Sequence, residues 1–141
     1  MITVWTDRES VAMGDDVVSH EHAWQLPDDA TPADLLVEVL RTGHLAHVAG
    51  PVAWTVETGH FEIREHGDWT EVRPVRTLVS AVVHQAADGT RVVTPISRYR
   101  LQQPFVQSPA APGPFAMRFG YSSEGETLDV DLFAARFTRG S

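Results

Sequence analysis

The chain has 141 residues, of which 43% are hydrophobic, and it contains no cysteine. Its length suits one domain with its own core, and the lack of cysteine excludes disulfides, Cys-ligated zinc and a thiol nucleophile. Residues 1–70 hold 13 acidic residues against three arginines, whereas residues 71–141 hold six against eight, within a net charge of −8. The acidic half is expected to repel phosphate groups and to attract basic proteins.

The start of the chain carries no targeting pattern. Residues 1–8 contain neither the basic stretch nor the apolar stretch of a signal peptide. No apolar run in the chain approaches the ~20 residues of a membrane-spanning helix. We therefore expect a cytoplasmic protein with no membrane partner, and residues 1–141 to form a single domain.

The first two predicted elements are short strands. In residues 2–6, Ile2 and Val4 alternate with Thr3 and Trp5. Residues 20–26 form the second strand. Its alternation places four side chains on one face: His20, His22, Trp24 and Leu26.

A helix over about residues 32–42 is the clearest local prediction. Thr31 can cap its start, Pro32 suits the first position, Asp34 can complete a capping box, and Gly43 supplies a stop. Three residues are expected to form the buried stripe, with Glu38 and Arg41 more exposed. The stripe is Ala33, Leu36 and Leu40, flanked by Val37 and Val39.

Short strands are expected after the helix at 45–49, 52–57 and 61–65, because Gly50-Pro51 and Thr58-Gly59 interrupt the apolar pattern. Two strands, a helix and two strands within about residues 1–66 resemble a ββαββ β-grasp arrangement. This architectural resemblance implies no function.

The remaining half, about residues 70–137, reads as a series of β-hairpins. Strands at 77–84 and 91–101 flank Asp88-Gly89, which favours a tight turn. The proline-rich segment 102–114 is expected to be an exposed loop. A last hairpin is expected to pair the face of Phe115, Met117, Phe119 and Tyr121 with Leu128, Val130 and Leu132. The predicted fold class is α+β, with a mostly antiparallel sheet and one main helix.

No catalytic pattern stands out. The sequence has no Gly-x-Ser-x-Gly elbow, glycine-rich phosphate loop or dinucleotide fingerprint. Ser80 and His84 share a strand face but lie about 13 Å apart along it, too far for a direct hydrogen bond. Asp129 and Asp131 also share a face, as in any solvent-facing strand. We expect no catalytic residue.

Metal ligands are the next candidates. His20 and His22 stand close to Asp15 and Asp16 and could hold zinc or iron if the turn folds back, but a strand end and a turn explain the same residues. His44 and His47 follow the predicted end of the helix and read as capping or surface histidines. We expect no metal and no cofactor.

A basic patch on the C-terminal sheet is also conceivable. Its arginines are Arg73, Arg76, Arg91, Arg98 and Arg100, with Tyr99 available for stacking. The acidic half disfavours nucleic acid as a partner.

These patterns favour a non-catalytic binding protein, of the kind that small bacterial inhibitor and immunity proteins represent, whose carboxylates neutralise a basic partner. The expected binding residues are Asp15, Asp16, Glu21, Asp28, Asp29, Asp34 and Glu38. One alternative is a metal- or histidine-dependent enzyme or ligand-binding protein with a pocket between helix and sheet. Another is an assembly subunit that forms homo-oligomers through the apolar face of its C-terminal sheet.

Overall fold

The computed structural model describes residues 1–9, 20–45, 52–108 and 113–122. It is an α+β protein, mostly sheet, with one main helix. The elements in chain order are β1 (Ile2–Arg8), β2 (His22–Leu26), α1 (Pro32–Thr42), β3 (Val52–His66), β4 (Trp69–Gln85), β5 (Arg91–Pro95), α2 (Arg98–Gln102), the 3-10 helix η2 (Phe105–Gln107) and β6 (Phe115–Ser122).

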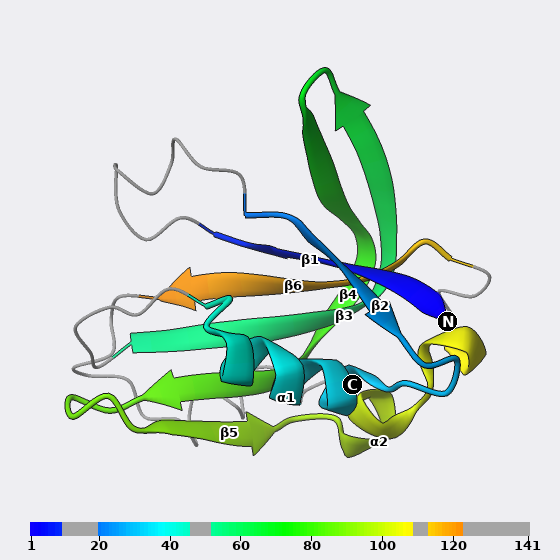
Figure 1. The fold of residues 1–141 in the computed structure, drawn as a ribbon. Coiled ribbons are helices and arrows are strands. Elements are labelled where there is room, and N and C mark those ends of the chain that lie inside the picture. The colour runs from blue at the N-terminus through cyan, green and yellow to red at the C-terminus, as the bar shows by residue number, and fades with distance from the viewer. Residues whose placement is uncertain (10–19, 46–51, 109–112, 123–141) are drawn as a thin grey trace.

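The six strands form one curled sheet in the order β2-β1-β6-β3-β4-β5 (Figure 1). Among these described strands, β1 and β6 pair in parallel, and the other neighbours are antiparallel. Strand β6 lies between β1 and β3, so the two predicted halves of the chain share one sheet. This order does not confirm the β-grasp arrangement.

Helix α1 begins and ends as its sequence predicts. Thr31 and Asp34 form a reciprocal capping box, and Gly43 ends the helix in the left-handed conformation. The buried stripe differs from the prediction, because Leu35, Leu36 and Val39 face the sheet. Ala33 and Leu40 are only partly buried, and Val37 is 62% exposed.

The main core lies between α1 and one face of the sheet. Trp54, Val56, Met117 and Phe119 are fully buried there, together with the buried residues of α1. Phe115 and Tyr121 pack at the margin of the same cluster, so the four residues predicted to share a face of β6 do so. This face packs within the main core of its own chain, and binding of a second copy through the C-terminal sheet stays a prediction.

Residues 52–57 and 61–65 belong to one long strand, β3, and Thr58-Gly59 does not end it. Register shifts after Val56 and after His60 let the strand bend without a break. Among the described strands, β6 and β5 pair with the inner parts of β3 and β4, and the outer parts of β3 and β4 pair only with each other. They stand out from the sheet as a hairpin, which we call the arm (residues 60–76; Figure 1).

The predicted turn at Asp88-Gly89 does join two antiparallel strands, β4 and β5. The predicted strand 91–101 is wrong in its second part, because β5 ends at Pro95 and α2 follows. The Ser97 side chain caps α2 by accepting a hydrogen bond from the Arg100 backbone N–H.

Segment 102–114 is not simply an exposed loop. It includes η2, whose Phe105 is only 4% exposed and belongs to the main core. The predicted strand at 45–49 lies outside the described residues except for Leu45, and residues 128–132 lie outside them entirely. Within the described ranges, no helix is long and apolar enough to cross a membrane.

Candidate functional site

Helix α1 lies across the sheet with a groove on each side. The groove towards β2 has a volume of about 450 Å³. We call it the acidic groove, and its lining is Trp24, Gln25, Leu26, Pro27, Asp29, Ala30, Asp34, Val37 and Glu38. The groove on the other side, towards β5 and α2, has a volume of about 260 Å³ and is mainly apolar, with Leu36, Leu40, Val93 and Leu101 in its lining.

Three carboxylates give the acidic groove its charge. Asp29 follows the end of β2, and Asp34 and Glu38 stand one helical turn apart on α1. The described lining contains no basic side chain. Arg41, at the end of α1, forms an exposed ion pair with Glu38 from outside the groove. Three carboxylates that line one groove repel one another, and this repulsion favours a cationic occupant.

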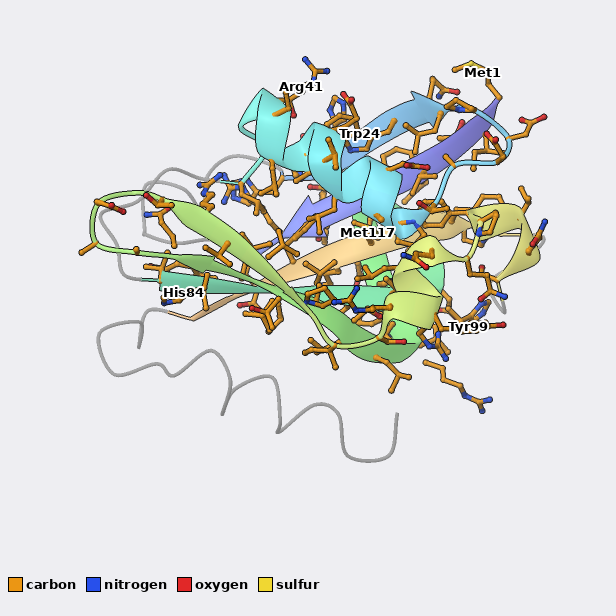
Figure 2. The ribbon with its side chains drawn as sticks, turned by 90° about the horizontal axis from the view of Figure 1, so that it is seen from below. Met1, Trp24, Arg41, His84, Tyr99 and Met117 are labelled. Atoms are coloured by element: carbon orange, nitrogen blue, oxygen red, sulfur yellow. The ribbon has the colours of Figure 1, made fainter. Side chains whose placement is uncertain are left out.

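Trp24 supplies an aromatic wall to the groove, beside α1 (Figure 2). Its Nε1 donates a hydrogen bond of 2.8 Å to Thr6 Oγ1. The ring also makes edge contacts with His22 and His44, at centroid distances of 4.6 Å and 5.9 Å. The indole is therefore held from behind by β1, β2 and the residue that follows the C-cap of α1.

His44 is the inner member of this cluster. Its pKa is lowered to about 4, chiefly by burial and in smaller part by the nearby charges of His22, Arg8 and His20. Its Nε2 lies 3.1 Å from Thr6 Oγ1. Since Trp24 can only donate to Thr6, we assign the hydroxyl hydrogen to His44 Nε2, which leaves the ring hydrogen on Nδ1.

The other predicted acidic residues have different surroundings. Glu21 Oε1 accepts a hydrogen bond of 3.0 Å from the Thr70 backbone N–H, so it faces the arm and not the groove. Asp28 lies 2.7 Å from the amino group of Met1, in an exposed pair. Asp15 and Asp16 lie outside the described residues. Of the seven predicted binding residues, the structure brings together Asp29, Asp34 and Glu38.

The described residues include no group of three side chains able to hold a metal. His20 and His22 lie at the start of β2, with His22 exposed and 6.1 Å from the His44 ring. His47, Asp129 and Asp131 lie outside the described ranges. The buried Ser80 hydroxyl lies 2.6 Å from Thr58 Oγ1, so its described partner is not His84.

The predicted basic patch is spread over three elements. Arg91 on β5 donates to the Gln85 side chain across the hairpin. Tyr99 and Arg98 are exposed on α2. Arg76 and Arg100 come together, because both line a hollow of about 350 Å³ at the base of the arm.

Sequence reasoning missed two contributors to the acidic groove, Trp24 and Val37. Val37 was expected to flank the buried stripe and Trp24 to share a strand face with Leu26, yet both line the groove and Val37 is largely exposed. Leu35, Val37 and Val39 all stand next to the predicted stripe of α1, and the sequence alone does not show which of them faces solvent. The acidic residues of α1 were recognisable because Asp34 and Glu38 are four residues apart and so share a face.

No family model, curated protein or solved structure matches this chain.

Proposed function

We propose that this chain is a non-catalytic binding protein whose acidic groove receives a basic segment of a partner protein, as an inhibitor or immunity protein would. The observation that carries the proposal is the convergence of three carboxylates and an aromatic ring in one groove without a basic side chain in its described lining. Complementary charge speeds the encounter with a basic partner and excludes acidic ones.

The groove suits an arginine side chain of the partner. Its guanidinium can donate hydrogen bonds to the carboxylates of Asp29 and Asp34 while its aliphatic stem packs against Trp24 and Val37. Burial of that stem removes apolar surface of Val37 from water. Because Trp24 is already fixed by its hydrogen bond to Thr6, little ordering of the ring is needed on binding.

The Glu38–Arg41 pair does not block this role. Both side chains are substantially exposed, and exposed pairs separated by one helical turn contribute little to stability. A partner guanidinium can therefore replace Arg41 at Glu38 at small cost. Removing the Arg41 charge should strengthen the binding of a basic partner.

The histidine-dependent enzyme has weaker support. His44 is held neutral and bonded to Thr6, and Thr6 is fully buried. The buried hydroxyl offers a substrate no access. In the described residues this cluster is better explained as the support that positions Trp24.

Calorimetric titration with an arginine-rich peptide tests the proposal. The peptide should bind at about 50 mM salt and bind at least about tenfold more weakly at about 300 mM salt. The double variant Asp29→Asn, Glu38→Gln should lose most of this affinity. A matched control, Glu62→Gln with Asp68→Asn, removes the same number of negative charges from the arm. This control should keep its affinity for the peptide.

Equal loss in the two double variants would show that overall charge, and not the groove, drives the interaction, and would overturn the proposal. With the natural partner, the same two double variants distinguish binding in the acidic groove from attraction by overall charge. A basic protein captured by the wild type and by the arm variant, but not by the groove variant, is the expected result.

A further inference from the structure

A second hollow lies at the base of the arm, away from the acidic groove. Its lining combines two arginines and a histidine with an apolar side chain: Gly59, His60, Val75, Arg76 and Arg100. Its volume is about 350 Å³. A smaller hollow of about 20 Å³ shares Gly59 and Arg100 with it and adds the polar side chains of Thr58, Gln103 and Ser108.

The bend in the arm brings these residues together. His60 pairs directly with Arg76 across the two strands, so both side chains are on the same face. The register shift after His60 leaves Val75 as the extra residue of a bulge, and its side chain is 52% exposed. Gly59 has a positive φ of 133°, and a Cβ there would collide with the Arg76 carbonyl oxygen.

Arg100 reaches the hollow from a separate element. The short helix α2 follows β5 and is capped by Ser97, whose Oγ accepts from the Arg100 backbone N–H at 3.3 Å. This bond fixes the first turn of α2 at Arg100, which lines the hollow together with the residues at the base of the arm. The two guanidinium groups therefore arrive from β4 and α2, which are brought together only in the folded chain.

Both guanidinium groups lack an ionic partner within the described part of the chain. Arg41, Arg64 and Arg118, in contrast, are each paired with a glutamate there. No carboxylate stands among the described lining residues of the hollow. Two unneutralised cations beside an imidazole produce a positive potential, which a bound anion would relieve.

We propose that this hollow binds the phosphate group of a phosphate monoester. A guanidinium presents paired N–H donors that match phosphate oxygens, and two such groups match its double charge. The His60 ring can donate a further hydrogen bond. The exposed Val75 side chain offers an apolar surface for the organic part of the ester. This site is independent of the acidic groove and of its basic partner.

The test uses phenyl phosphate as the probe, with inorganic phosphate and benzoate for comparison. Calorimetry should give the tightest binding for phenyl phosphate. Backbone amide NMR shifts should move at Gly59, His60 and Arg100. The double variant Arg76→Gln, Arg100→Gln should bind phenyl phosphate at least about tenfold more weakly. The control Arg73→Gln, Arg98→Gln removes two exposed arginines outside the hollow and should bind normally.

A third variant, Arg76→Lys with Arg100→Lys, keeps the charge but loses the paired donors and should give intermediate affinity. Absence of binding, or an equal loss in the control, would overturn the proposal. Inorganic phosphate that binds as tightly as phenyl phosphate would overturn the assignment to an ester, and benzoate that does so would overturn the assignment to phosphate. Unchanged thermal unfolding of the glutamine variant excludes loss of fold as the cause.

Discussion

Thr6 Oγ1 and His44 Nε2 lie 3.1 Å apart, although 38 residues separate them in the chain. Thr6 is fully buried in β1, and His44 directly follows the C-cap of α1. The bond therefore ties the end of the helix to the sheet. Through Thr6 it also extends to Trp24, which lines the acidic groove. Protonation of one ring can thus affect both stability and the groove.

The low pKa of His44 predicts that stability falls at acidic pH. Its pKa is about 4 in the folded chain against the ordinary 6.5, because burial disfavours the charged ring. Between these two values the unfolded chain binds the proton and the folded chain does not. The stability that the folded chain gains from keeping His44 neutral is fully present above about pH 6.5 and is lost as pH falls towards 4. Allowing for partial exposure, we expect a loss of about 1–2 kcal/mol.

Urea denaturation of the wild type and of His44→Gln from pH 7 to pH 4 measures this contribution. The variant lacks the titrating ring, so the stability difference between the two proteins should shrink or change sign as pH falls. A difference that stays constant over this range would contradict the assignment to His44.

Asp7 predicts the opposite dependence on pH. Burial raises the pKa of its carboxyl group, against the lowering effect of the Arg8 backbone N–H, and Glu21 raises it further. A raised pKa means that the ionised form is disfavoured in the folded chain, so stability is lost as pH rises through that pKa. Asp7→Asn should therefore be more stable than wild type at pH 7, by at most about 1 kcal/mol.

Thermal unfolding of Asp7→Asn and of the wild type at pH 7 and pH 3 tests whether the substitution stabilises the fold. The advantage should be present at neutral pH and should disappear in acid, where the wild-type carboxyl group is protonated. Asp68→Asn, at the exposed tip of the arm, is the control and should have little effect at either pH. A variant less stable than wild type at pH 7 would refute the prediction.

Helix α1 was predictable because its signals are local. The capping box, Pro32 and Gly43 act within a few residues and do not depend on the rest of the fold. The continuity of β3 was not predictable in this way. Thr58-Gly59 reads as a break in a single sequence, and only pairing with β4 converts it into a bend within one strand.

The candidate site was predictable only in part, for a related reason. Asp34 and Glu38 share a face because helical spacing determines it. Asp29 and Glu21 lie at the two ends of β2, where sequence alone does not say which element comes close. The structure places Asp29 beside α1 and Glu21 against the arm. The meeting of Arg76 with Arg100 depends on α2, which the strand pattern of residues 91–101 concealed.

Removing the helix cap should destabilise the fold by a predictable amount. Thr31 Oγ1 accepts from the Asp34 backbone N–H at 3.1 Å, and the Asp34 carboxylate accepts from the Thr31 backbone N–H at 3.0 Å. Thr31→Ala removes the first bond and should cost about 1 kcal/mol in the free energy of unfolding, measured by urea denaturation. Thr31→Ser keeps a hydroxyl and should cost much less. If Thr31→Ala and Thr31→Ser lost similar amounts of stability, the loss would come from side-chain packing and not from the capping hydrogen bond.

Gly59, just before the arm in β3, and Gly67, at the tip of the arm, form a matched pair for testing why β3 bends. Both have positive φ, 133° and 66°, which side chains disfavour. Around Gly67 nothing lies within 4 Å of an added Cβ, so Gly67→Ala carries only the backbone cost of about 1 kcal/mol. At Gly59 an added Cβ would collide with the Arg76 carbonyl oxygen and also meet Thr77 Cα at 3.0 Å.

Both neighbours of Gly59 are backbone atoms, so relief requires the strands to separate. Gly59→Ala should therefore lower the free energy of unfolding by about 2–4 kcal/mol, clearly more than Gly67→Ala. Urea denaturation of the two variants measures the difference. Equal costs would mean that the close approach of β3 and β4 at Gly59 is not maintained in solution. The bend that brings His60, Arg76 and Arg100 to one hollow would then need another cause.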